Sequence, residues 1–391
     1  MEKVRIGIIG VGNMGSAHAA CISRGDVPGL ELAALCDIAE PRRQVCRERF
    51  PETAVFERYE DLLEQPDLDA VLIAVPHPLH TAIALAALEK GKHVLLEKPV
   101  DVSVSRARVL NEAAEKSGLV FGIMFNQRTN ALFRRAREIV RSGELGRLKR
   151  SVWIITNWYR SQRYYDSGSW RATWSGEGGG VLLNQCPHQL DLWQWIVGMP
   201  SEVTAFCDVA KYHHIEVEDD VTILTRYPGG ATGTFITTTG EYPGTNRLEI
   251  TGTLGKLVLE DGKLKWWRLL EDEAQIRFSA DVNSPAIPME YQELLPEYPE
   301  AAHAGILRDF TGAVLNGTPL LAPGCEGIRE LTVSNAAYLS AWQGSIPVKI
   351  PFDEAAFDAE LARRAAASLQ KEREPSRDWS GTYPRRWQIN W

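Results

Sequence analysis

The chain has 391 residues, of which 44% are hydrophobic and 24% charged, and its formal net charge at pH 7 is −8. This composition is typical of a globular protein, the length predicts two domains, and the negative charge argues against a nucleic-acid-binding surface. No apolar stretch approaches the roughly 20 residues that span a bilayer, so we expect no membrane partner. The first residues lead directly into a strand-like run, and the six cysteines are scattered without a C-x-x-C pair. Both features favour a cytoplasmic protein.

Residues 4–22, "VRIGIIGVGNMGSAHAACI", predict a strand, a glycine-rich turn and a helix in succession. The three glycines have the G-x-G-x-x-G spacing of a dinucleotide-binding turn. The first permits the tight turn, the second lets the backbone approach a pyrophosphate, and the third allows close packing of helix on strand. The amides and dipole at the start of the helix attract phosphate groups. The cofactor contacts expected here are Gly10, Gly12, Asn13, Met14 and Gly15.

A second predicted strand ends at Asp37, at the spacing of the residue that binds an adenosine ribose in such folds. A carboxylate there accepts hydrogen bonds from the 2′- and 3′-hydroxyls and repels a 2′-phosphate. We therefore expect NAD as the cofactor and disfavour NADP, although Arg42 and Arg43 follow closely and soften that preference. A second role for Asp37, capping the next helix, is compatible with ribose binding.

Strand-like and helix-like runs alternate strictly up to residue 125, which predicts a parallel, doubly wound sheet with ligands at the carboxyl ends of its strands. "VPHPLH" and "LLEKPV" leave polar residues at two such ends. Lys98 precedes a proline, which restricts its geometry, and the alternative for Lys98 is an ordinary surface lysine. For His80, packing on a helix face and contact with the nicotinamide end of the cofactor stay open. The further expected cofactor contacts are Pro76, His80, Glu97 and Lys98.

Residues 176–198, "GEGGGVLLNQCPHQLDLWQWIVG", place a histidine on an unusual backbone. The glycines let the chain lie close to a ligand, and a helix that begins near Pro187 tolerates the proline in its first turn. His188 is then held on a rigid element, and the alternative is a merely buried histidine. Asn184 converges with it. Asp191, one turn further on, either orients the imidazole or caps and packs.

"GIIGVGNMG", "LLEKPV" and "GGGVLLNQCPHQLD" occur in this order. Together they resemble the motifs of the glucose–fructose oxidoreductase, inositol dehydrogenase and rhizopine-catabolism (Gfo/Idh/MocA) family, over roughly residues 3–350. The resemblance implies a nicotinamide-dependent oxidoreductase acting on sugars, sugar derivatives and cyclitols, with Lys98 and His188 as its catalytic pair. The chain departs from the family at Asn184, where an aspartate is common, and at Cys186-Pro187. An asparagine still bonds a sugar hydroxyl or the imidazole, but it cannot stabilise an imidazolium by charge.

From about residue 148, threonine- and valine-rich runs separated by Gly, Pro and Asp turns indicate an antiparallel sheet. The predicted fold is therefore α/β: an N-terminal Rossmann doubly wound parallel sheet and a C-terminal α/β domain with an open, mostly antiparallel sheet. One face of that sheet must meet solvent or another subunit. We expect a homodimer or homotetramer through it, and the resemblance points the same way.

Residues 157–174, "NWYRSQRYYDSGSWRATW", combine aromatic rings and arginines in a loop. A sugar presents an apolar C–H face and hydroxyl edges, which suit an aromatic platform and guanidinium donors. A subunit interface has the same residue types, so that alternative stays open. The expected substrate contacts are Asn184, Arg163, Tyr164, Trp170 and Arg171.

These features predict an NAD(P)-dependent dehydrogenase acting on CH–OH groups. His188 is the expected general base, and Lys98 the expected donor to the substrate oxygen, for hydride transfer from a secondary alcohol of a sugar, sugar derivative, glycoside or cyclitol. One alternative is a redox-cycling enzyme that holds its NAD and gives net elimination or glycoside cleavage. The other is a non-catalytic NAD-binding sensor. The run "YHHIEVEDD" is read as a solvated turn, and no metal site is expected.

The predicted domains are a dinucleotide-binding domain (1–125), a substrate-binding and oligomerisation domain (126–350) and a C-terminal helix with an aromatic arm (351–391). We expect the arm to dock on the second domain or on a neighbouring subunit, because its end is too aromatic for a simple disordered terminus. The aromatic residues concerned are Trp379, Tyr383, Trp387 and Trp391.

Overall fold

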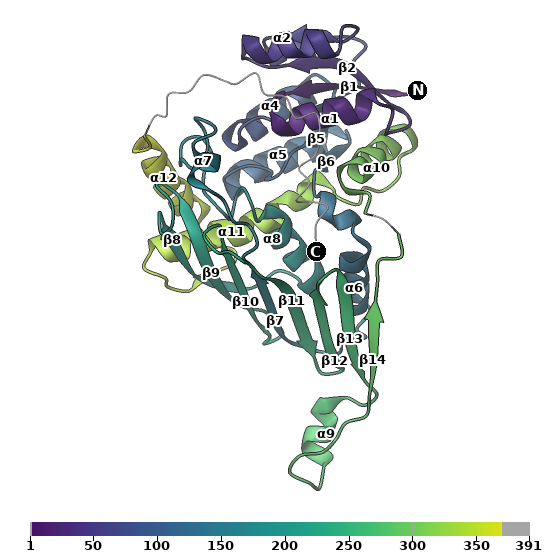
Figure 1. Cartoon of the computed structure of the whole chain (residues 1–391), viewed down its shortest axis with the longest axis vertical. Helices are drawn as coiled ribbons and strands as arrows, with labels where there is room; N and C mark the ends of the chain where they lie inside the picture. The colour runs from purple at the N-terminus through teal and green to yellow at the C-terminus, as the bar shows by residue number, and fades with distance from the viewer. Residues whose placement is uncertain (1, 299, 370–391) are drawn as a thin grey trace.

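The computed structural model describes residues 2–298 and 300–369. Two sheets organise these residues, a small parallel one near the N-terminus and a large one formed by the later strands (Figure 1). The predicted fold class is confirmed. No helix within the described residues is long and apolar enough to cross a membrane.

The first sheet is parallel and has six strands in the order β3-β2-β1-β4-β5-β6. Its strands are β1 (Val4–Ile9), β2 (Leu30–Cys36), β3 (Ala54–Phe56), β4 (Ala70–Ile73), β5 (His93–Leu96) and β6 (Phe121–Ile123). Its connecting helices are α1 (Asn13–Ser23), α2 (Glu40–Arg49), α3 (Tyr59–Leu63), η1 (His77–Leu79), α4 (His80–Glu89) and α5 (Val104–Ser117). Every residue of β4 is buried, as expected of a strand covered by helices on both faces.

The second sheet has nine strands in the order β14-β13-β12-β11-β7-β10-β9-β8-β15. They are β7 (Leu148–Ile155), β8 (Glu202–Val209), β9 (Glu218–Arg226), β10 (Thr232–Thr238), β11 (Asn246–Gly252), β12 (Gly255–Glu260), β13 (Lys263–Leu269), β14 (Met289–Leu294) and β15 (Val348–Lys349). All neighbouring strands are antiparallel except the central pair β7 and β10, which is parallel.

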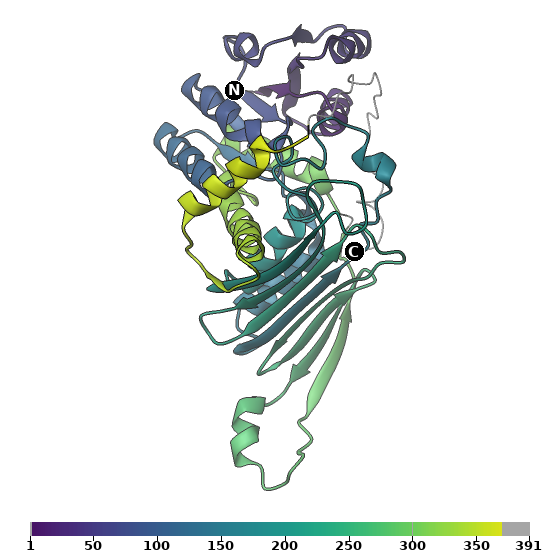
Figure 2. The ribbon, with the colours of Figure 1, turned by 90° about the vertical axis from the view of Figure 1, so that its left-hand side faces the viewer.

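One face of this sheet is covered and the other is open. On β7, Ser151, Trp153 and Ile155 are buried, whereas the alternate residues Val152 and Ile154 are only partly buried. The buried face lies against helices that follow the first sheet in the chain, and Figure 2 shows the sheet with its helices on one side. Those helices are α6 (Ala131–Arg141), α8 (Pro187–Val197) and α11 (Gly327–Trp342). The other helices of this part of the chain are η2 (Asn126–Thr129), α7 (Gln162–Tyr165), α10 (Ala302–Asn316) and η3 (Gly324–Glu326), of which α10 contacts β1 and η3 contacts β6 in the first sheet.

The chain returns to the first sheet near its C-terminal end. The amide of Ile123 on β6 donates to the carbonyl oxygen of Ala322 at 3.1 Å. The amide of Val104 at the start of α5 donates to the side chain of Asn335 on α11 at 3.0 Å. The helix α12 (Glu354–Ala366) also packs on α5, where Asp358 accepts from two serine hydroxyls. The predicted aromatic arm, from Trp379 onward, lies outside the described residues.

A hairpin extends the edge of the large sheet away from the body of the molecule (Figures 1 and 2). The strands β13 and β14 pair along six residues, and the segment between them carries the short helix α9 (Glu273–Ser279). This helix contributes no buried residue, and Phe278 on it is 85% exposed.

One buried cation links the elements between the two sheets. Arg128, on η2, is fully buried between the rings of Phe125 and Trp195. Its Nε and Nη2 donate to the two carboxylate oxygens of Asp191 on α8, at 2.8 and 2.6 Å. Its Nη1 donates to Glu326, at the base of α11. The three elements η2, α8 and α11 are thus held by one guanidinium group.

Replacing Arg128 by methionine is expected to lower the free energy of unfolding by about 3–5 kcal/mol, because it leaves the Asp191 carboxylate buried without its cation. Chemical denaturation followed by circular dichroism measures the change. Arg24→Met, which removes an exposed pair with Asp26, is the control and should cost less than about 1 kcal/mol. Equal losses for the two variants would contradict the role of Arg128.

Candidate active site

The glycine turn after β1 has the shape of a dinucleotide cradle. Gly10 has φ +90, and a Cβ there would lie 2.6 Å from the carbonyl oxygen of Ala74. A Cβ on Gly15 would lie 1.9 Å from the carbonyl oxygen of Gly10, so the helix and strand meet only because both residues are glycine. A Cβ on Gly12 would meet nothing within 4 Å. The backbone at Gly12, at the N-terminus of α1, is therefore open to the close approach of a phosphate group.

Asp37 follows β2 and holds this turn. Its Oδ2 accepts from the amide of Val11 and its Oδ1 from the amide of Ala39, both at 2.9 Å. An ionised carboxylate has about four acceptor positions, so both oxygens keep capacity for ribose hydroxyls. Arg43 is committed elsewhere, to the carbonyl oxygens of Asp37 and Ile38 and to two glutamates.

The backbone around Lys98 is fixed from two sides. The peptide bond from Lys98 to Pro99 is cis. The Glu97 carboxylate bonds to Nε2 of His18 at 2.8 Å and accepts from the amide of Lys98 at 3.2 Å. The ring nitrogens of His80 lie 2.7 Å from the carbonyl oxygen of Pro99 and 2.9 Å from that of Val75. His80 and Glu97 thus use their polar atoms to brace the ends of β4 and β5.

Lys98 reaches across to the second half of the chain. Its Nζ donates to the backbone carbonyl oxygen of Asn184 at 2.8 Å, although the two residues are 86 positions apart. Asn184 lies in the turn before α8, and Pro187 is the first residue of that helix. The structure therefore brings the lysine after β5 to the start of α8.

His188 is the second residue of α8 and is 2% exposed. Its ring meets that of Phe125 edge to face at 6.4 Å. Burial holds the pKa of His188 well below its usual range, and the positive charge of Lys98 and the nearby His303 lower the pKa further. His188 is therefore a neutral imidazole within electrostatic reach of Lys98. Asp191 binds Arg128 with both oxygens, so its observed role is to anchor α8.

Three of the expected substrate residues form one stack. The guanidinium of Arg171 lies over the rings of Tyr164 and Trp170, at 4.6 and 4.5 Å, and donates to the Tyr164 hydroxyl at 2.8 Å. Trp170 meets the ring of His77 at 5.7 Å, which joins the stack to the first domain. Arg163 is exposed on α7 and is not brought into this stack.

The sequence analysis missed Glu177, which is 1% exposed and belongs to the site. Its Oε1 accepts from the side-chain amide of Asn184, and its Oε2 accepts from the backbone amide of Ala172 at 2.6 Å. Its own carbonyl oxygen bonds to Nδ1 of His77 at 3.0 Å. Burial raises the pKa of Glu177, and the positive charge of Arg171 opposes that rise. A single acidic residue within "GEGGG" was the feature that could have identified it.

The run "YHHIEVEDD" is not the solvated turn that the sequence analysis expected, because Asp219 is fully buried and hydrogen bonds hold the loop in place. Nδ1 of His213 bonds to Asp219 at 2.8 Å, and its Nε2 bonds to the carbonyl oxygen of Arg160 at 2.9 Å. Asp219 also accepts from the amides of Lys211 and Tyr212. Among the described residues, no group of three or more His, Cys, Asp or Glu is placed to hold a metal ion.

The fold and this site define a dinucleotide-dependent oxidoreductase. Residues 4–125 match the family model described as "Oxidoreductase family, NAD-binding Rossmann fold", and residues 133–258 match the "GFO/IDH/MocA C-terminal domain". The chain belongs to the Gfo/Idh/MocA family. The predicted class, an NAD(P)-dependent dehydrogenase with NAD as its cofactor, is confirmed.

The chain is similar to several characterised proteins along most of its length. It is 26% identical over 317 residues to a levoglucosan dehydrogenase of Pseudarthrobacter phenanthrenivorans, covering 72% of this chain and 78% of the relative. It is 26% identical over 339 residues to a myo-inositol 2-dehydrogenase of Thermotoga maritima, covering 85% and 95%. Among solved structures, the WlbA dehydrogenase of Chromobacterium violaceum with NADH and UDP-GlcNAcA has a TM-score of 0.77 at 25% identity. That comparison covers 90% of this chain and 97% of the other.

The neutral state of His188 predicts a pH dependence of stability. In the unfolded chain the pKa returns to about 6.5, so below that pH the unfolded state binds a proton that the folded state excludes. Below pH 6.5 this difference lowers the free energy of unfolding by about 1.4 kcal/mol for each pH unit. Above pH 6.5 the protonation of His188 no longer contributes to the free energy of unfolding.

Denaturation of the wild type and of His188→Gln at pH 7.5, 6.0 and 5.0 measures this contribution. The variant should lose stability less steeply than the wild type below pH 6.5. His214→Gln, in an exposed loop, is the control and should keep the wild-type slope. If the free energy of unfolding of His188→Gln and of the wild type fell equally steeply with pH, His188 would not be a neutral imidazole in the folded protein.

Proposed function

We propose that this protein oxidises a secondary alcohol of a sugar, sugar derivative, glycoside or cyclitol to the ketone, with NAD as the hydride acceptor. The observation that carries the proposal is the Lys98 ammonium group, bonded to the turn that delivers His188. The named activities of the levoglucosan and myo-inositol dehydrogenases support this substrate class.

The residues present fit the chemistry of alcohol oxidation. His188 is neutral and buried, so it can accept the hydroxyl proton as the C–H bond breaks. Lys98 donates a hydrogen bond to the same oxygen and stabilises the negative charge that develops there. When bound, NAD⁺ supplies the acceptor for the hydride at its nicotinamide C4. The proton leaves on His188 and the carbonyl product keeps its oxygen against Lys98.

The stack of Tyr164, Trp170 and Arg171 is proposed to position the substrate. Aromatic faces suit the C–H face of a sugar ring, and the guanidinium offers several N–H donors to its hydroxyl edge. Trp170 contacts His77, which belongs to the first domain. A substrate that binds against the stack is therefore also held at a fixed position relative to the first domain.

Lys98→Ala and His188→Ala are each expected to lower kcat by about 10²–10⁴-fold, the usual contribution of a positioned acid or base. NADH formation is measured by absorbance with levoglucosan, myo-inositol, scyllo-inositol and D-glucose. Lys90→Ala, which removes an exposed lysine paired with Glu64, is the control and should leave the rate unchanged. Unchanged turnover in the Lys98 and His188 variants would refute the catalytic assignment. Net conversion without free NADH would instead favour the redox-cycling enzyme.

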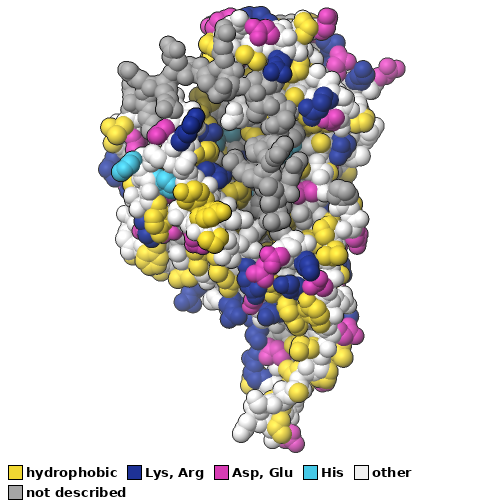
Figure 3. Space-filling model, viewed as in Figure 1, with side chains coloured by type: hydrophobic (Ala, Val, Ile, Leu, Met, Phe, Trp, Pro, Cys, Tyr) yellow, Lys and Arg dark blue, Asp and Glu magenta, His cyan; other side chains and the backbone are white. Residues whose placement is uncertain are grey.

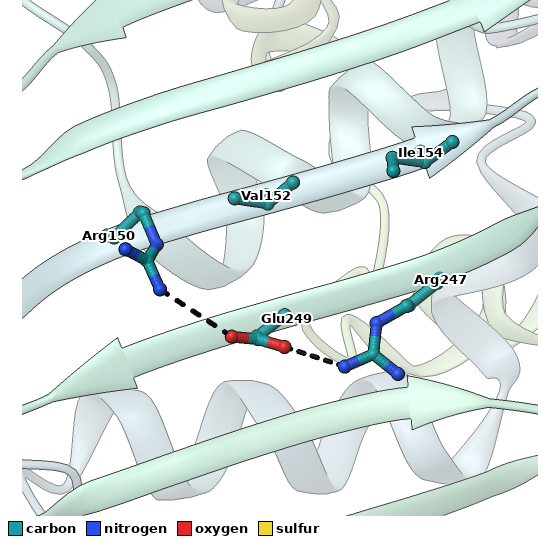
Figure 4. Close-up of a pocket in the computed structure, with 5 residues that line it drawn as sticks. All are labelled: Arg150, Val152, Ile154, Arg247 and Glu249. Carbon is teal, nitrogen blue, oxygen red and sulfur yellow. Dashed lines mark hydrogen bonds and ion pairs between the residues drawn. The ribbon is translucent and has the colours of Figure 1, made fainter.

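The open face of the large sheet is proposed to join two copies of the chain in a homodimer or homotetramer. A hollow on this face is lined by Arg150, Val152, Ile154, Arg247 and Glu249 (Figure 4). Glu249 lies between the two arginines, 2.6 Å from Arg247 and 3.8 Å from Arg150. Figure 3 shows basic, acidic and hydrophobic side chains mixed over the lower strands. A surface that carries both charges and apolar groups can be self-complementary, as a two-fold interface requires. A cytoplasmic location stays a prediction.

Glu249→Arg is expected to dissociate the assembly, because it would place three arginines together on the shared face. Light scattering coupled to size exclusion measures the mass, and circular dichroism checks the fold. Glu89→Arg, an exposed charge reversal on α4, is the control and should keep the wild-type mass. A wild-type monomer at micromolar concentration, or an unchanged mass for Glu249→Arg, would contradict the interface.

A further inference from the structure

Glu177 and Asn184 form a pair in which each hydrogen-bonding role is fixed. A carboxylate only accepts hydrogen bonds, whereas an amide side chain can donate from its NH2 or accept at its oxygen. Oε2 of Glu177 is occupied by the backbone amide of Ala172, a donor that cannot be reversed, and Oε1 receives the amide of Asn184. One N–H of Asn184 is therefore bonded to Glu177, and this orients the amide so that its carbonyl oxygen lies on the side away from the carboxylate.

This oxygen belongs to a residue at the centre of the site. The backbone of Asn184 receives the Lys98 ammonium group at 2.8 Å, and its side chain is only partly buried. Glu177 itself is 1% exposed, so its carboxylate is less accessible than the side chain of Asn184. The backbone carbonyl oxygen of Glu177 bonds to His77 of the first domain. The positive charge of Arg171 acts on the Glu177 carboxylate and opposes the rise in its pKa that burial causes.

We propose that Glu177 is a positioning residue, which orients Asn184 so that the Asn184 side-chain oxygen accepts a hydrogen bond from a second hydroxyl of the substrate, beside the alcohol that is oxidised. This inference rests on the proposed function. It assigns a defined role to the asparagine and makes a free hydroxyl donor a requirement of the substrate. A site built to bond a hydroxyl discriminates strongly against an analogue that lacks it.

The pair can be tested by exchanging its members. In Glu177→Gln, the fixed amide of Ala172 takes the oxygen of the new side chain, so the NH2 group of the glutamine faces Asn184. Asn184 must then turn over and present a donor to the substrate. In Asn184→Asp, two carboxylates meet. In the double variant, the glutamine donates to the aspartate and an acceptor oxygen is again available to the substrate.

The activity of the three variants is measured as kcat/KM for whichever of levoglucosan, myo-inositol, scyllo-inositol and D-glucose the wild type oxidises fastest. Glu177→Gln is expected to lose about 10–100-fold, as for a mispaired buried polar group, and the double variant to return to within about 3-fold of the wild type. A merely structural Glu177 would give no such rescue. Wild-type activity in Glu177→Gln, or a double variant no better than either single one, overturns the inference.

Thermal unfolding provides a readout that does not depend on turnover. Asn184→Asp is expected to lower the Tm by about 2–4 °C, and the double variant to restore it. Fluorescence titration with NADH should give wild-type affinity for all three variants, which shows that the first domain is intact. If the wild type oxidises none of the four compounds, the proposed function fails and the substrate contact fails with it. The Tm cycle then decides separately whether Glu177 orients Asn184, and a double variant no more stable than Asn184→Asp refutes that.

Discussion

The buried guanidinium of Arg128 is the interaction on which the geometry of the site depends. It extends from the segment after β6 and binds Asp191 on α8 and Glu326 below α11. A charge buried so completely is stable only with its partners in place, so the three elements have little freedom to shift independently. His188 is the second residue of α8, one turn before Asp191. The position of the imidazole is therefore set by an ion pair that does not touch it.

A second set of contacts fixes Lys98 in the same way. The His18–Glu97 bond and the two contacts of His80 hold the backbone on either side of the lysine. The amine of Lys98 then donates a hydrogen bond to the backbone carbonyl oxygen of Asn184. The two proposed catalytic groups thus come from different parts of the chain, Lys98 from the segment after β5 and His188 from α8, and each is supported by buried polar residues nearby. Rigid support of this kind is what the proposed acid–base chemistry on one oxygen requires.

Local patterns predicted much of this molecule. The glycine turn, the alternation of strands and helices, Lys98 and the late start of the helix at Pro187 each follow from neighbouring residues. The pairings could not be predicted, because they join residues far apart: Arg128 with Asp191 is separated by 63 positions. Composition drew attention equally to Arg163 and Arg171, but only packing distinguishes the exposed side chain from the stacked one.

The tip of the hairpin that carries α9, unlike the elements around the site, is not packed into the core of the protein. It is joined to the molecule through the pairing of β13 with β14 and, at the start of α9, through the bond of Glu273 to Lys149 on β7, and its helix places nothing in the core. Substitutions, insertions or a fused reporter beyond Glu273 on this tip are expected to leave both sheets and the groups around Lys98 unchanged.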